Sequence, residues 1–244
     1  MVEPRELAEQ FELGVVLPAG SEERFAGYGV MGQPFASGHL LALRRFPVTS
    51  LGAGYTSIWH RDPAGVWTFV QDAPPERSCP RYFGSALSRT LVRDIRIVWS
   101  GPRAFTVSVN GDWSLEWQVA LSSNSATRAF NLAAGLLPLS VWRKRRLLDL
   151  IGRTASRLTG MGRITLTGQV PNRQRFLSQP RYVWKVAASR ARLNGVDLGP
   201  PGPLADQANL ADVWLPQEGR FFVGYSFLES FDPARHIEAP PPSA

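Results

Sequence analysis

Hydrophobic and polar residues alternate along three neighbouring segments in the middle of the chain. Residues 94–100 read DIRIVWS, residues 104–109 read AFTVSV and residues 113–121 read WSLEWQVAL. A period of two places the apolar side chains of each segment on one face and the polar ones on the other. This pattern is typical of antiparallel strands with one face buried in the core and the other more exposed to solvent.

Shorter segments with the same character lie before and after these three, bounded by Gly, Pro and Asn-Gly turns. They are GYGVM from Gly27, HLLALRRF from His39, GYTSIWHR from Gly54, VWTFVQD from Val66, RITLTGQ from Arg163, YVWKVAASRARL from Tyr182 and RFFVGYSFLESF from Arg220. The sequence therefore predicts a mainly β protein of about ten strands. We expect an antiparallel barrel or a strongly curved sheet, with a β-sandwich as the alternative.

One long segment, residues 126–159, has a helical period instead. Its apolar residues, such as Leu148 and Ile151, fall on one stripe of a helical wheel, as expected of a helix that docks on the rest of the fold. Three arginines occupy the opposite side: Arg143, Arg145 and Arg146. Two interpretations stay open. The insert closes one mouth of the barrel, or it is a lid whose arginines contact an anionic membrane surface. Nucleic acid is not expected, because no binding motif is present.

The predicted organisation is a single β domain with two flanking segments. Residues 1–26 form an N-terminal arm, residues 27–235 form the β-barrel-like domain with the insert at 126–159, and residues 236–244 form a proline-rich tail predicted to be disordered.

Composition and the terminal sequence indicate in which cellular compartment the protein resides. The chain has 244 residues, of which 44% are hydrophobic, and a net charge of +7. Cys79 is the only cysteine, so no internal disulfide can form. The acidic N-terminus lacks the apolar run of a secretory signal, and no window approaches the ~20 apolar residues of a spanning helix. We expect a cytoplasmic protein, with contact to a membrane surface as an open alternative.

Candidate chemistry is sparse. The three histidines lack metal-ligand spacing, and no phosphate- or dinucleotide-binding loop is present, so we expect neither a metal nor a cofactor. His60, Tyr55 and Glu116 are the candidate acid/base residues, because they are titratable groups on otherwise apolar strands. On the strand from Gly54, alternation places His60 and Tyr55 on opposite faces. The candidate ligand-binding residues are aromatic: Trp59, Trp67, Trp99, Trp117, Trp184 and Tyr225.

The early hairpin carries the pattern His60, Asp62, Gly65 and Trp67. With the later PNRQRFLSQPRYVWKVAASRARLNGVDLG, this pattern resembles the lipocalin-like (calycin) hydratase and cyclase group, which includes the carotenoid hydratase and AttH-like proteins. The resemblance implies a barrel cavity for a hydrophobic, isoprenoid or polyketide-like molecule. The chain departs from that group because it is shorter than its two-barrel members and carries the helical insert. No catalytic residue is carried over.

Two functions follow from the sequence. The first is the binding of a hydrophobic small molecule, such as a lipid, an isoprenoid or a polyketide-like compound, in a cavity covered by the insert. The alternative is a cofactor-free hydratase, isomerase or cyclase, which requires at least two of the acid/base candidates to meet in one pocket.

Overall fold

The computed structural model describes residues 2–122, 131, 147–149, 151–152, 156 and 160–238. Within this part of the chain the longer strands are β1 (Glu23–Pro34), β2 (Leu40–Thr49), β3 (Gly52–Arg61), β4 (Trp67–Gln71), β5 (Arg89–Val92), β6 (Ile95–Gly101), β7 (Ala104–Val109), β8 (Leu115–Leu121), β10 (Arg175–Leu193) and β14 (Arg220–Leu228). The short strands are β9 (Thr167–Gln169), β11 (Val196–Asp197), β12 (Asn209–Leu210) and β13 (Val213–Trp214). The helices are α1 (Pro4–Glu12) and α2 (Pro80–Phe83), with short 3-10 turns at Pro75–Arg77 and Gly84–Ala86.

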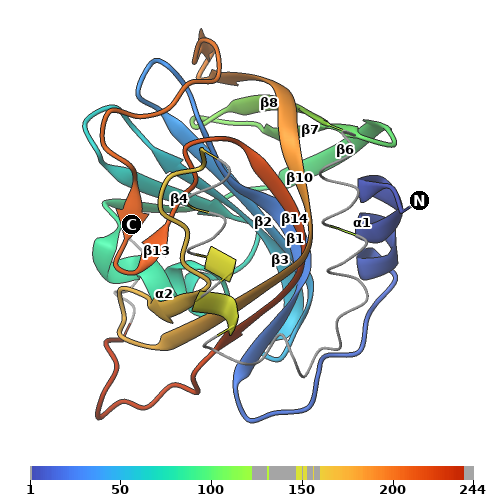
Figure 1. The fold of residues 1–244 in the computed structure, drawn as a ribbon. Helices are drawn as coiled ribbons and strands as arrows, with labels where there is room; N and C mark the ends of the chain where they lie inside the picture. Colours follow the sequence, from blue (N-terminus) through green and yellow to red (C-terminus); the bar gives the residue numbers. More distant parts are fainter. Residues whose placement is uncertain are drawn as a thin grey trace.

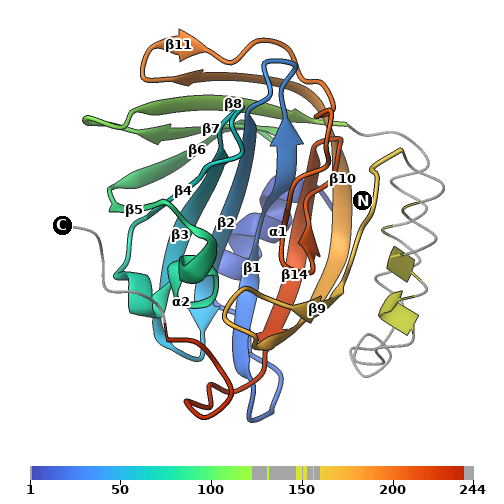
Figure 2. The ribbon, with the colours of Figure 1, turned by 90° about the vertical axis from the view of Figure 1, so that its left-hand side faces the viewer.

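Ten strands lie side by side in the order β5-β4-β3-β2-β1-β14-β10-β8-β7-β6. All neighbouring pairs are antiparallel except β4 and β5. The prediction of a mainly β, strongly curved antiparallel sheet is confirmed (Figures 1 and 2). A closed barrel is not formed among the described strands, because the strand order ends at β5 on one side and at β6 on the other.

Strand β10 joins the two halves of the sheet. Its first half pairs with β14 and its second half with β8, with register shifts between Pro180 and Tyr182 and between Val186 and Ala188. Such bulges bend a strand and increase its twist, and a bulge tolerates the missing N–H of proline. β10 thus turns the sheet so that β6, β7 and β8 face the strands from β1 to β4 (Figure 1).

The curved sheet has a hydrophobic core on each face. Between its two halves, Trp117, Phe221 and Val107 are fully buried together with side chains of α1. On the opposite face of β1, β2, β3 and β4 a second core contains Tyr55 and Phe69. This second core is covered by α2 and by coil that follows β9 (Figure 2).

The predicted N-terminal arm begins with a helix. Pro4 starts α1, and Glu3 and Glu6 form a reciprocal capping box that satisfies the first backbone N–H groups. Leu7 and Phe11 point into the first core. The arm is therefore docked on the sheet at this end.

The helical insert lies mostly outside the described residues. Residues 147–149 and 151–152 are helical, and Leu148 is fully buried against Leu166, with Ile151 beside it. Leu148 and Ile151 belong to the predicted apolar stripe, and at these two positions the stripe faces the rest of the fold. Arg143, Arg145 and Arg146 lie outside the described residues. None of the described helices is long and apolar enough to span a membrane.

The beginning of the predicted disordered tail is packed against the fold, which differs from the expectation. His236 is buried beside Phe231, and the backbone N–H of Ile237 donates to the carbonyl of Asn172. An aromatic contact and a backbone hydrogen bond thus hold residues 236 and 237, and the proline-rich residues 239–244 lie outside the described residues.

Candidate functional site

A cavity of about 120 Å³ lies beside the second core. Strands β1, β2, β3, β10 and β14 form one side of it, and α2 with residues 164–166 and 213–216 form the rest. Most of its wall is apolar or aromatic, from Phe25, Met31, Phe46, Tyr55, Trp59, Tyr82, Phe83, Leu166, Phe176, Trp214, Leu215 and Phe222. A concave, mainly apolar cavity with a few polar groups is the usual form of a small-molecule site.

The most polar group in this wall is the guanidinium of Arg44. On β2 it shares a face with Ala42 and Phe46, whereas Arg45 points to the other face and pairs with Glu12. The guanidinium lies over the ring of Trp59, 4.4 Å from its centroid, as in a cation–π contact.

Arg44 is anchored by main-chain carbonyls. Its Nη1 donates to the carbonyl oxygens of Val30 at 2.6 Å and Leu43 at 2.9 Å, and its Nη2 donates to that of Met31 at 3.1 Å. These three bonds use three of the five guanidinium N–H donors. The Nε–H and one Nη2–H of Arg44 have no partner among the described residues, and together they can form one fork.

No carboxylate pairs with Arg44 within the described part of the chain. Burial lowers its pKa to about 10, while Cys79 and Tyr55 oppose that change. Arg44 therefore stays positively charged at neutral pH. Arg44 is half-buried, and a partly desolvated cation is stabilised by a partner of opposite charge. The arrangement favours an anion in the cavity.

A row of polar side chains extends from Arg44 across the sheet. Arg44 is the cross-strand neighbour of Ser57, and Ser57 is that of Gln71. The Ser57 hydroxyl, the Gln71 amide and the Trp59 indole N–H are all buried and lack a hydrogen-bond partner among the described residues. Buried polar groups are nearly always bonded, and Ser57 and Trp59 both act on the Cys79 thiol, whose pKa they lower.

Tyr55 and Cys79 form a second polar pair in the wall. The Tyr55 hydroxyl lies 3.5 Å from Cys79 Sγ, and both residues are almost fully buried. Burial raises the pKa of Tyr55 well above its usual value, and burial also raises the pKa of Cys79. Both groups are therefore neutral at physiological pH and act as hydrogen-bonding groups.

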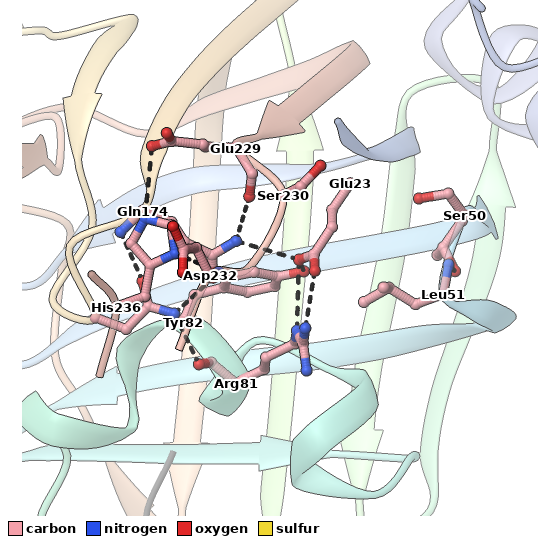
Figure 3. Close-up of polar contacts among 12 residues, drawn as sticks. Glu23, Ser50, Leu51, Arg81, Tyr82, Gln174, Glu229, Ser230, Asp232 and His236 are labelled. Carbon is pink, nitrogen blue, oxygen red and sulfur yellow. Dashed lines mark hydrogen bonds and ion pairs between the residues drawn. The ribbon is translucent and has the colours of Figure 1, made fainter. Parts of the chain in front are cut away.

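Glu23 lies at the centre of a polar cluster on the outer side of Tyr82 (Figure 3). Its carboxylate accepts hydrogen bonds from the Tyr82 hydroxyl and from Arg81, whose Nη2 is 2.8 Å from Oε1. Gln174 Nε2 donates to the same carboxylate at 3.4 Å and to the carbonyl of Glu229. The cluster joins β1, α2 and the start of β10.

The structure does not bring the three acid/base candidates together. Tyr55 lines the cavity. His60 is buried on the opposite face of β3, with its Nε2 2.9 Å from Nδ1 of His39. Glu116 is exposed on β8 and accepts a hydrogen bond from Gln118. Within the described residues there is also no group of three His, Cys, Asp or Glu side chains that could hold a metal ion.

The aromatic candidates divide between the two cores. Trp59 and Tyr225 line the cavity. Trp67 packs edge-on against Phe69 in the second core. The other three belong to or pack on the first core, away from the cavity: Trp99, Trp117 and Trp184.

Arg44 and Glu23 were not among the predicted site residues. For Arg44 the sequence holds a signal, because a charged residue interrupts the apolar stripe of Leu40, Ala42 and Phe46. For Glu23 no local signal exists, since its partners Arg81 and Gln174 are far away in the sequence.

No protein-family model and no curated protein matches the chain. Among solved structures the chain is similar to the crystal structure of acetoacetate decarboxylase from Legionella pneumophila subsp. pneumophila str. Philadelphia 1. The two are 10% identical, the match covers 95% of this chain and 94% of that chain, and the TM-score is 0.41. The predicted resemblance to the lipocalin-like hydratase and cyclase group stays a prediction.

Proposed function

We propose that the protein binds a small, mainly apolar molecule that carries one carboxylate, and that Arg44 binds this carboxylate. The observation that carries the proposal is the partly buried, charged guanidinium in the wall of an aromatic cavity, with two N–H donors and no counter-charge among the described residues. The Nε–Nη2 edge of an arginine matches the two oxygens of a carboxylate.

The size of the cavity narrows the ligand class. An engineered apolar cavity of about 150 Å³ binds benzene. The cavity here, about 120 Å³, therefore favours a ligand of roughly one aromatic ring over a lipid chain or an isoprenoid. The ring would lie among Phe25, Tyr55 and Phe222, all of which face the cavity.

Binding rather than catalysis is supported best. The predicted hydratase or cyclase needs two acid/base groups in one pocket, and among His60, Tyr55 and Glu116 only Tyr55 lines this cavity. Contact of the insert with a membrane remains a separate prediction.

Benzoate, with benzyl alcohol as its neutral counterpart, tests the proposal by titration calorimetry. Benzoate is expected to bind, and Arg44→Met is expected to weaken binding by about 10- to 100-fold, because a charge-assisted hydrogen bond contributes about 1.5–3 kcal/mol. Arg45→Met is the matched control, since Arg45 is the next residue on β2 and faces away. Equal affinity for benzoate and benzyl alcohol, or equal losses in the two variants, would contradict the assignment.

A further inference from the structure

The wall of the cavity contributed by α2 has little secondary structure of its own. α2 has only four residues and is flanked by two 3-10 turns. A single helical turn is not stable by itself. Yet Cys79, at its N-cap, and Tyr82 and Phe83 within it all line the cavity. We call residues 79–83 the α2 cover.

Few hydrogen bonds hold this cover on the sheet. The backbone N–H of Asn172 donates to the Tyr82 carbonyl at 3.0 Å, and Asn172 Nδ2 donates to the Arg81 carbonyl at 3.2 Å. Cys79 adds the long contact with Tyr55. Aromatic packing adds to these bonds, since Tyr82 lies edge-on to Phe25 and Phe83 packs on Trp59. The cover is nevertheless a single turn outside the strand ladders, which is the kind of element that opens locally.

The charged attachment of the cover is Glu23. Its carboxylate is bound through both oxygens by Arg81 and also accepts the Tyr82 hydroxyl, so two consecutive residues of the cover depend on one side chain (Figure 3). The Glu23 side chain is 12% exposed, so this is a partly desolvated, charge-assisted cluster.

We propose that the α2 cover opens to admit the ligand and that Glu23 is the positioning residue that keeps it closed. The ligand route rests on the proposed function, whereas the opening itself can be measured without any ligand. Opening exposes Cys79 and moves Tyr82 and Phe83 away from the aromatic wall, while the curved sheet with Arg44 stays in place.

The chain supplies its own probe of this motion. Cys79 is the only cysteine and is 3% exposed, so alkylation of its thiol requires local opening or global unfolding. Iodoacetamide labelling followed by intact-protein mass spectrometry gives the rate. When closing is faster than labelling, this rate is proportional to the open population.

A matched control exists on the other face of the sheet. Glu12 also accepts hydrogen bonds from an arginine and a tyrosine, Arg45 and Tyr28, and it attaches α1 rather than α2. Glu12→Gln therefore removes the same kind of charged cluster without touching the α2 cover.

Glu23→Gln is expected to accelerate the labelling of Cys79 at least about tenfold, given the usual loss on breaking charge-assisted hydrogen bonds. Tyr82→Phe, which keeps the ring in the wall, is expected to give a smaller increase. Glu12→Gln is expected to leave the rate within about twofold. Low urea should change the rate in Glu23→Gln only weakly, because local opening exposes little surface and global unfolding exposes much.

Equal rates in Glu23→Gln and the wild-type protein would overturn the proposal. So would a rate that follows urea as steeply as global unfolding, or equal acceleration by Glu12→Gln. If Glu23→Gln does not fold, the labelling rate of Cys79 in Tyr82→Phe tests the proposal by the same criteria.

Benzoate separates this inference from the proposed function. If both hold, benzoate slows labelling in the wild-type protein and dissociates faster from Glu23→Gln. If benzoate neither binds nor protects Cys79 while Glu23→Gln still accelerates labelling, the proposed ligand is wrong and the opening of the cover stands. If benzoate binds and protects Cys79 but Glu23→Gln labels at the wild-type rate, the role of Glu23 is wrong and the ligand site stands.

Discussion

Acidification is expected to destabilise the fold through His60. This residue is 6% exposed, stacks with His39 and lies near the ring of Trp113. Burial, and to a smaller extent the nearby His39, lower the pKa of His60 to about 4, while Asp62 opposes the change. In the unfolded chain the pKa of a histidine is about 6.5.

The two pKa values give the direction and the size of the change in folding stability with pH. Between pH 6.5 and pH 4 the unfolded chain binds a proton that the folded protein does not, so stability is fully present above pH 6.5 and is lost as pH falls through 4. A pKa difference of about 2.5 corresponds to about 3.4 kcal/mol at the low-pH limit, at about 1.36 kcal/mol per unit. At pH 4.5 the loss relative to pH 7 is about 2.4 kcal/mol.

Urea unfolding of the wild-type protein and of His60→Gln at pH 7 and pH 4.5 measures this contribution. Carboxylates titrate in both proteins, so the difference between the two isolates His60. The wild-type protein should lose about 2 kcal/mol more than His60→Gln between these pH values. His39→Gln should keep most of the pH dependence, because burial of His60 is the larger cause. An identical pH dependence in the wild-type protein and His60→Gln would refute the reasoning.

Three further substitutions test the packing. Phe221→Ala, at a fully buried position in the first core, should lower the free energy of unfolding by about 3–5 kcal/mol in urea titrations, and a loss below 1 kcal/mol would contradict its burial. Ser189→Ala leaves the indole N–H of Trp117 buried without its 2.9 Å partner and should cost about 1–3 kcal/mol, detected as a lower unfolding midpoint; an unchanged midpoint would argue against this bond. Glu116 is exposed and accepts a hydrogen bond from Gln118. Glu116→Gln should therefore change the free energy of unfolding by less than about 0.5 kcal/mol and leave the affinity for benzoate unchanged in calorimetry. A larger change in either quantity would contradict an exposed position remote from the cavity.

The sequence was most informative where the pattern is local. The alternation of Ile95, Ile97 and Trp99 depends only on the period of two, and β6 has the predicted bounds to within one residue. The same reasoning correctly placed Tyr55 and His60 on opposite faces of β3. Local periodicity determines which residues share a face, and in this sheet that was enough to predict the class of fold.

What alternation cannot determine is which face lines a cavity and how the sheet closes. Both faces of β3 are buried, because the sheet has a core on each side. The register shifts within β10 turn the sheet back on itself. Pro180 marks the first of them, whereas nothing in the local pattern marks the second, between Val186 and Ala188. For this reason a barrel and a curved sheet were equally compatible with the sequence.

The candidate site was the hardest part to predict for the same reason. Arg44 and Arg45 are adjacent and have the same side chain. Only the tertiary fold determines that Arg45 pairs with the carboxylate of Glu12, whereas Arg44 lines the cavity. Glu23 acquires its role from Arg81 and Gln174, which reach it through long-range folding. Charged residues inside an apolar stripe, as at Arg44, are the sequence feature to examine first in a chain of this kind.

A crystal structure of the protein with benzoate tests the central claim most directly. We expect the aromatic ring inside the cavity, with the carboxylate oxygens about 2.7–2.9 Å from Nε and Nη2 of Arg44. Benzoate bound elsewhere, or seated in the cavity with its carboxylate away from Arg44, would contradict it.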